Sequence, residues 1–150
     1  MTCQYNDFLT ATGFALTIEG ESGITAAVQS FTHPTVSTQN AIQSSPRRDI
    51  PVPGDKLVYD ALNVVIILNA DMGSYKAVYD WLESCVENVD GNEKDVHLHI
   101  MSSTNNAGPV ITYENAFPID VGAISFATTD QGDSYITVDA TFAYTRYQIS

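Results

Sequence analysis

A strict alternation of apolar and polar residues near the C-terminus limits the fold of this chain more than any other feature. Ile136, Val138, Ala140, Phe142 and Tyr144 fall on one side of an extended segment, while threonine, aspartate and alanine fall on the other. A period of two residues places successive side chains on opposite faces of a β-strand. The segment therefore predicts a strand with one face on a core and the other facing water or a partner.

The same alternation recurs in shorter segments. Residues 14–18 and 24–28 flank a turn rich in glycine and glutamate, which predicts a β-hairpin. A longer strand is predicted over residues 57–68, and its second half is apolar on both faces, which predicts a central strand covered on both sides. Further strands are predicted at residues 96–100, 110–113 and 123–126.

One segment has the period of a helix, because its apolar residues recur every three or four positions and charged residues occupy the other face. Asp71 or Ser74 can cap the start of this helix, and residues 88–91 end it. Trp81 lies off the apolar stripe, which predicts a place at the helix edge or in a subunit contact. The stripe consists of Tyr75, Val78, Tyr79, Leu82, Cys85 and Val86.

Together these elements predict a mainly β (α+β) fold: an antiparallel β-sandwich or barrel with one flanking α-helix. The length of 150 residues fits a single domain over residues 1–150. No apolar run is long enough to cross a membrane, and no secretory leader is visible at the N-terminus. We therefore expect a soluble protein made in the cytoplasm, with Cys3 and Cys85 as reduced thiols.

The charge balance argues against a protein that holds nucleic acid or anionic lipid. The chain has 18 acidic residues against 6 Lys and Arg, a net charge of −12. Contacts to phosphates come from Lys and Arg, so adhesion to DNA, RNA or anionic lipid is not expected. The acidic excess either keeps the protein in solution or forms a surface that repels polyanions.

The sequence contains no recognisable catalytic signature. His97 and His99 would share one face of a strand with Asp95, but no third ligand stands at a metal-binding spacing, so an exposed or interface histidine pair is the favoured interpretation. There is no nucleophile elbow and no phosphate-binding glycine motif. We therefore expect no enzyme activity, no cofactor and no metal. Two alternatives stay open: a monomeric β-sandwich ligand-binding module, and a metal-dependent enzyme that uses the two histidines.

Residues 32–53 have no local explanation. They are polar, interrupted by proline and too poor in apolar side chains to form a core. A long segment of this kind in a compact domain is usually functional or disordered. A partner that orders it is the natural interpretation.

Three stretches, taken in order, resemble parts of a known family. Residues 24–34 (ITAAVQSFTHP) look like an early strand that ends at a proline-marked bend. Residues 47–62 (RRDIPVPGDKLVYDAL) look like a basic-then-aliphatic strand with a Gly-Asp turn, and residues 113–126 (YENAFPIDVGAISF) like an aromatic-Pro-x-Asp-Val-Gly segment. On these motifs the chain, from residue 14 to residue 149, resembles the tail tube protein of contractile-tailed (myovirus-type) bacteriophages.

The resemblance implies a structural virion protein that is assembled in the host cytoplasm. Members of that family form homohexameric rings, which stack into a hollow tail tube through which the phage DNA is ejected. The implied partners are further copies of the chain, the tail sheath and the baseplate, with DNA passing through and no membrane. A baseplate ring that initiates the tube, or the tube of a related contractile injection or secretion system, is the alternative within this interpretation.

The resemblance also implies which residues make contacts. The family's long loop between its second and third strands reaches the adjoining ring, and its counterpart comprises Ser37, Thr38, Gln39, Asn40, Ala41, Ile42, Gln43, Ser44, Ser45, Arg47 and Arg48. Arg47 and Arg48 would pair with acidic neighbours. Screening limits charge repulsion to about 8 Å, so only acids that line a narrow channel would keep phosphates off its wall. The candidates for that lining are Asp49, Asp55, Asp60 and Asp139.

Overall fold

A computed structural model describes residues 9–20, 23–24, 28–88, 91–102, 106–128 and 135–150 of the chain. The described elements are mainly strands, with one long helix among them. In chain order they are β1 (Leu9–Ile18), β2 (Val28–Thr32), β3 (Val36–Thr38), β4 (Ala41–Gln43), β5 (Ile50–Val52), β6 (Leu57–Tyr59), β7 (Leu62–Ile67), α2 (Gly73–Glu87), β8 (Lys94–Ser102), β9 (Ala107–Val121), β10 (Thr137–Ala143) and β11 (Arg146–Ile149).

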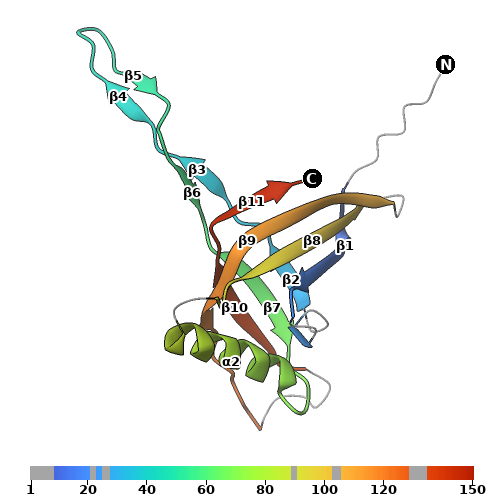
Figure 1. Cartoon of the computed structure of the whole chain (residues 1–150). Helices are drawn as coiled ribbons and strands as arrows, with labels where there is room; N and C mark the ends of the chain where they lie inside the picture. Colours follow the sequence, from blue (N-terminus) through green and yellow to red (C-terminus); the bar gives the residue numbers. More distant parts are fainter. Residues whose placement is uncertain (1–8, 21–22, 25–27, 89–90, 103–105, 129–134) are drawn as a thin grey trace, which may run out of the picture.

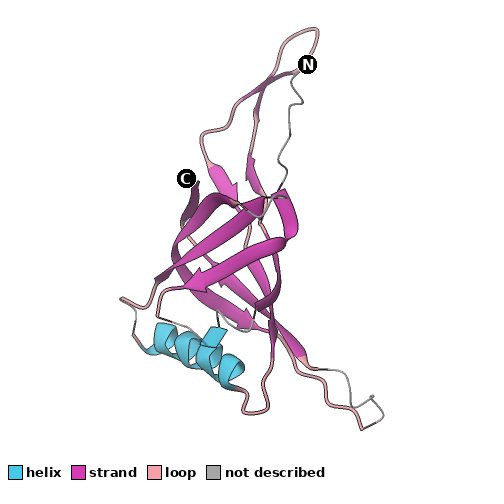
Figure 2. Ribbon diagram, turned by 90° about the vertical axis from the view of Figure 1, so that its right-hand side faces the viewer, coloured by secondary structure: helices cyan, strands magenta, loops and turns pink. Residues whose placement is uncertain are grey.

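Seven of the strands form one curled antiparallel sheet in the order β1-β8-β9-β10-β7-β2, with β11 paired to β9. The sheet wraps around a core, α2 crosses one end of it, and the β3–β6 segment rises from the opposite end (Figure 1). Figure 2 shows the same arrangement from the side, with the helix and the rising segment well separated. The predicted fold class, an antiparallel β structure with a flanking helix, is confirmed.

The core is built from the inward faces of the strands, as their alternation predicts. Val138, Ala140 and Phe142 of β10 are buried, and they meet Leu62 and Val64 of the neighbouring strand β7. Each large aliphatic or aromatic side chain removed from water in this way contributes about 1.5–3 kcal/mol of transfer free energy. Buried residues of β1, β8 and β9 complete the cluster: Leu16, Ile18, Val96, Leu98, Ile111 and Tyr113.

β9 belongs to both halves of the sheet because it bends in its middle. Asn115 has a φ of 56°, in the left-handed region that Asn tolerates better than most residues. The register with β8 shifts at this point, and the Asn115 N–H donates to the Asp95 carboxylate at 3.2 Å. Before the bend β9 pairs with β8 and β11, and after it β9 pairs with β10. Pro118 lies beside a second register shift, where a missing ladder donor is tolerated.

Helix α2 turns a different face to the core from the one that the sequence pattern predicts. Ser74, Val78 and Trp81 are its buried residues, whereas Tyr79 and Val86 are exposed. Trp81, predicted at the edge or in a subunit contact, is only 4% exposed and packs on Phe142 with ring centroids 5.6 Å apart. That prediction was wrong because the pattern merged two apolar faces into a single stripe.

The ends of α2 are closed by side chains. The carboxylate of Asp71 accepts a hydrogen bond from the Gly73 N–H at 3.1 Å, which confirms one of the two predicted caps. Ser74, the other candidate, is buried and donates instead to the carbonyl of Ile67. At the far end, the side-chain amide of Asn92 donates to the carbonyls of Ser84 and Asn88.

Several strand predictions are corrected by the pairing. In the described residues of the predicted hairpin 14–28, β1 pairs with β8, whereas β2 begins at Val28 and pairs with β7; residues 21–22 and 25–27 lie outside the described residues. Residues 123–126 are not a strand, and β9 ends at Val121. The predicted strand 57–68 is two strands, broken at Asp60 and Ala61. Local alternation identifies a strand but not its partner, which explains the wrong hairpin.

The outer face of β7 also differs from the prediction. Val65 and Ile67 are half-buried and Asn63 is exposed, so the strand is central but is not covered on both sides. β11 was not predicted at all. Its four residues, Arg146–Ile149, are too few to show a period.

Candidate assembly interface

The β3–β6 segment forms an arm, which we define as residues 36–59, that projects from the sheet (Figure 1). The arm is a two-stranded ribbon in two parts. β3 pairs with β6 next to the sheet, and β4 pairs with β5 farther out, both antiparallel. Residues 39–40 and 53–56 interrupt the ribbon between these two ladders. The segment without a local explanation in the sequence is therefore an ordered hairpin.

The arm exposes aliphatic side chains that no other described element covers. Ile42 is 65% exposed and Leu57 is 62% exposed, and four other aliphatic residues of the arm are exposed as well. An isolated two-stranded ribbon is at best marginally stable in water, so it gains stability from a surface that covers it. The other exposed members are Val36, Ile50, Val52 and Val58.

Gly54 sets the shape of the interruption between the two ladders. A Cβ atom on Gly54 would collide with the carbonyl oxygen of Gln39, so no larger residue fits without moving the backbone. Pro51 lies in β5 on an edge strand, where the absence of an N–H costs no sheet hydrogen bond. These two residue types permit the bent ribbon that the sequence alone did not show.

A cluster of aromatic rings holds the root of the arm. His33, just before the arm, contacts Tyr147 with ring centroids 4.8 Å apart, and its Nδ1 lies 2.6 Å from the Tyr113 hydroxyl. Tyr59, the last residue of β6, packs edge-on against Tyr144 and Tyr147. The arm is thus anchored at both of its strands to side chains of the main sheet.

Burial changes the acid–base properties of this cluster. Desolvation, reinforced by the neighbouring tyrosines, raises the pKa of Tyr113 well above its ordinary value. Burial also raises the pKa of Tyr144 to about 12, with smaller contributions from Tyr147, Asp60 and Tyr59. Part of the His33 ring reaches solvent, but its packed side lowers the pKa of the imidazole. Tyr113, Tyr144 and His33 are therefore neutral at pH 7.

The structure places the predicted contact residues along the arm. Ser37 and Thr38 lie in β3, and Ala41, Ile42 and Gln43 form β4. The remaining ones connect the two ladders or form the tip: Gln39, Asn40, Ser44, Ser45, Arg47 and Arg48. Both arginines are exposed, and neither pairs with a carboxylate among the described residues. The aliphatic residues of β5 and β6 were missed, although Ile50, Val52, Leu57 and Val58 give a visible signal between the prolines and the tyrosine.

The four candidate channel acids do not gather on one surface of the chain. Asp49 lies near the arm tip, Asp55 at the interruption and Asp60 just past β6, whereas Asp139 lies in the middle of β10. Asp139 lies in a part of the sheet whose strands carry no basic side chain. Strands β2, β7 and β10 contain no Lys or Arg, while Lys94, His97, His99 and Arg146 lie on β8 and β11.

The histidine pair of β8 takes part in the sheet surface. His97 Nδ1 lies 3.1 Å from the Thr112 hydroxyl, and His99 is exposed. Within the described residues, no three His, Cys, Asp or Glu side chains are close enough to hold a metal ion. Nor is any helix in those parts of the chain long and apolar enough to cross a membrane.

Two other features of the sequence analysis have a place in the structure. Cys85 is a free, half-buried thiol whose pKa is raised by burial and by Glu93, while the other cysteine, Cys3, lies outside the described residues. The exposed aromatic residues Tyr79, Phe126 and Tyr135 lie on three different segments. Of these three, Phe126 lines a groove with Leu68 and Ile136, and neither Tyr79 nor Tyr135 is among the described residues that line it.

Comparison with known proteins finds likeness in structure alone. No protein-family model matches the chain, and no curated protein sequence does. The tube-terminating cap of the anti-feeding prophage (AFP) superposes with a TM-score of 0.71 at 16% identity, over 100% of this chain and 94% of that chain. The sheath–tube complex of an extracellular contractile injection system, PVC, in the extended state gives 0.71 at 14% identity, over 99% and 93%.

A protein of a type six secretion system is more distant. Its TM-score is 0.54 at 13% identity, over 91% of this chain and 82% of that chain. At identities this low, the superpositions show a shared fold alone. The chain therefore has the fold of tube components of contractile injection systems, and it has that fold along almost its whole length.

Proposed function

We propose that this chain is a structural subunit of the tube of a contractile tail or a related contractile injection machine. Copies assemble into six-membered rings, and the rings stack into a hollow tube. The observation that supports this most strongly is the likeness to the AFP and PVC tube components over the full length of the chain, the arm included.

Ring formation has a physical basis in the sheet edges. β1 and β2 stand at opposite ends of the strand order, and within the part of the chain that the structure describes each has a ladder partner on one side only. Unpaired edge groups attract further strands, and closure of a ring removes them. A head-to-tail contact between one edge and the other generates a closed ring when the rotation between subunits divides a full turn.

The arm supplies the axial contact in this proposal. Its exposed aliphatic side chains lose their contact with water when a subunit of the next ring covers them, at about 25 cal/mol per Å² of apolar surface. The tip brings Arg47 and Arg48, two of the 6 basic residues, to that contact. The net charge of −12 makes acidic partners abundant on any neighbouring copy.

The proposal extends to what passes through the tube and to the proteins that surround it. We place the face of β2, β7 and β10 on the channel, because it carries Asp139 and no cation. A wall without Lys or Arg gives DNA phosphates no point of attachment. The tube then serves as the DNA conduit of a phage tail, surrounded by a sheath and standing on a baseplate. Asp49, Asp55 and Asp60 add negative charge where the arms meet the channel.

Negative-stain electron microscopy of the purified chain, with a mass measurement in solution, tests the assembly function. We expect hollow rings with six-fold symmetry, and tubes as concentration rises. A monodisperse species of 16.3 kDa at high concentration would contradict the proposal. The Gly54→Ala variant is a control, because it distorts the arm and leaves the sheet edges intact: it should form rings but not tubes.

A further inference from the structure

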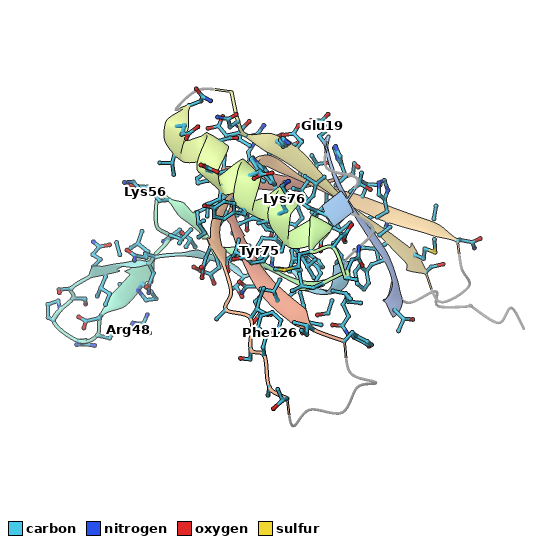
Figure 3. The ribbon with its side chains drawn as sticks, turned by 90° about the horizontal axis from the view of Figure 1, so that it is seen from below. Glu19, Arg48, Lys56, Tyr75, Lys76 and Phe126 are labelled. Carbon is cyan, nitrogen blue, oxygen red and sulfur yellow. The ribbon has the colours of Figure 1, made fainter. Side chains whose placement is uncertain are left out.

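Helix α2 carries a second row of apolar side chains beside the face that meets the core: Tyr75 and Leu82 are half-buried, and Tyr79 and Val86 are exposed. We define the outer stripe as Tyr75, Tyr79, Leu82 and Val86, whose spacing of four, three and four residues aligns them along one side of a helix. Val86 is 77% exposed and Tyr79 is 51% exposed. Figure 3 looks onto this end of the molecule and shows Tyr75 on the helix, with Arg48 far out on the arm. The stripe extends for about 16 Å at 1.5 Å per residue.

Grooves lie at both ends of the outer stripe. A groove of about 320 Å³ is lined by Leu82, Cys85 and Val86 of the helix and by Phe117 and Pro118 of β9, together with the polar residues Asn88, Asn92 and Glu93. At the N-terminal end, a groove of about 350 Å³ is lined mainly by apolar residues: Leu68, Ala70, Met72, Phe126 and Ile136, together with Asn69. The stripe shares Leu82 and Val86 with the first groove, and we call these two features together the apolar track of α2.

The charged residues beside the stripe are unfavourable for the helix on its own. Glu83 and Glu87 lie toward the C-terminal end of α2, where the helix dipole disfavours negative charge, and the last turn contains no basic residue. Asp80 adds a third acid, against Lys76 as the one basic residue of the helix. A basic group from outside would relieve this arrangement.

The arm offers the matching chemistry at the opposite end of the molecule. Ile42, Ile50 and Val52 are exposed on its outer ladder, and the exposed Arg47 and Arg48 form its tip. α2 crosses the end of the sheet from which the arm does not emerge (Figure 1). A molecule with an apolar, basic projection at one end and an apolar, acidic track at the other is complementary to itself in a head-to-tail arrangement.

We propose that the outer stripe of α2 is the seat of the arm of a second copy of this chain. Ile42, Ile50 and Val52 of the arm cover Tyr79, Leu82 and Val86, and the tip arginines face Glu83 and Glu87. This inference rests on the proposed tube function and names the surface that receives the arm. The occupant is a second copy, because the same chain carries both halves of the charge and apolar match.

A charge-swap experiment on the full chain tests this assignment. The variants are Arg47→Glu with Arg48→Glu, Glu83→Arg with Glu87→Arg, and all four changes together. Tube length is measured by electron microscopy, and assembled mass by sedimentation. We expect each pair alone to shorten tubes at least tenfold while rings persist, and the fourfold variant to recover at least half of the original length.

Matched control variants separate the effect of losing the arm–helix contact from the effect of changing the net charge. Lys56→Glu reverses one positive charge of the arm, as Arg47→Glu does, but at the interruption between the ladders instead of at the tip. Glu19→Arg reverses one negative charge, as Glu83→Arg does, but at a site outside α2. Both should leave tube length within twofold of the original. Glu83→Arg with Glu87→Arg should not lower the free energy of unfolding, since basic residues suit the end of a helix.

The outcomes distinguish the two proposals. Absence of rings and tubes from the unmodified chain would overturn the tube function and this inference with it. Normal tubes from the helix reversal would overturn the inference alone and leave the stripe to a different protein, such as a sheath subunit. Loss of tubes in both pairs without recovery in the fourfold variant would also overturn it, because the two sites would then not face each other.

Discussion

The indole Nε1 of Trp81 donates a hydrogen bond to the main-chain carbonyl of Asn92 at 2.7 Å. The same asparagine caps the last carbonyls of α2 through its side chain, so one residue closes the helix and fixes its tryptophan. Lys94 then stacks over the indole, with its Nζ 5.0 Å from the ring centroid. These contacts fasten α2 to the start of β8, and they make Trp81 the residue on which the attachment of the helix depends.

Replacement of Trp81 by alanine should therefore destabilise the chain by about 3–5 kcal/mol, from the cavity and the lost hydrogen bond. Trp81→Phe should cost less, because it keeps part of the packing on Phe142. Urea unfolding followed by circular dichroism measures both, since Trp81 is the single tryptophan and fluorescence is lost with it. Tyr79→Ala, on the exposed face of the same helix, should change the free energy of unfolding by less than about 0.5 kcal/mol.

Alkaline pH should destabilise the fold through the buried tyrosines. Unfolded tyrosines ionise near pH 10, whereas burial keeps Tyr113 protonated well above that and raises the pKa of Tyr144 to about 12. A raised pKa in the folded state gives stability that is complete below pH 10 and is lost as pH rises toward the folded pKa. Unfolding free energies between pH 9 and about 11.5 should fall in the native chain. The slope should be shallower in Tyr113→Phe with Tyr144→Phe, and equal slopes would contradict the assignment.

The bend of β9 should depend on the residue at position 115. Asn115→Gly should change stability by less than about 0.5 kcal/mol, because glycine adopts a positive φ freely. Asn115→Val should cost about 1–2 kcal/mol, since a β-branched residue is strained in that region. Thermal unfolding of the two variants gives the comparison. Equal melting temperatures would mean that the backbone relaxes out of the left-handed conformation.

Gly54→Ala should separate the arm from the rest of the fold. A methyl group at this position collides with the Gln39 carbonyl, so the path of the ribbon must change. The core lies elsewhere, and the cooperative melting temperature should therefore stay within a few degrees of the original. Limited proteolysis should cut the arm at least several times faster. Unchanged proteolysis together with unchanged assembly would show that the ribbon accommodates the methyl group.

Reversal of Asp139 and Asp60 to lysine tests the channel lining. If these carboxylates face the lumen, the variant should still form tubes but should retain short duplex DNA, more strongly at 50 mM than at 200 mM salt. Co-sedimentation of fluorescent duplex with tubes measures retention, and ejection from assembled particles should slow. Glu19→Lys is the matched control outside the proposed lining. Unchanged retention and ejection would remove the two aspartates from the channel wall.

The fold class was predictable because it depends on local periods. Val138, Ala140 and Phe142 alternate in the sequence and are buried together in the structure. Which strands pair was not predictable, since the segment at residue 14 and the segment at Val28 look like neighbours in sequence while β1 and β2 end at opposite edges of the sheet. The face of α2 was misassigned for a related reason: both of its sides carry apolar residues, and a single sequence does not say which side meets a core.

The location of the candidate interface could be predicted from the sequence, but its structure could not. The polar, proline-interrupted segment and its two arginines indicated a region that needs a partner, and the family resemblance indicated its direction of contact. Its form as a ribbon depends on close approach at Gly54, which no composition or period encodes. The channel acids were chosen by charge alone. Their position relative to a lumen is a property of several chains together, and the sequence of one chain does not contain it.

The interruption between the two ladders of the arm has a mechanical consequence. Residues 39–40 on one strand face residues 53–56 on the other, so the outer ladder can tilt without breaking a hydrogen bond of either ladder. Each ladder has three residue pairs, so a bend of the arm that preserves both ladders must lie at the joint. A filament tied together by many such joints would bend by small tilts shared among its links, and would stay continuous under a sideways load that snaps a rigid rod.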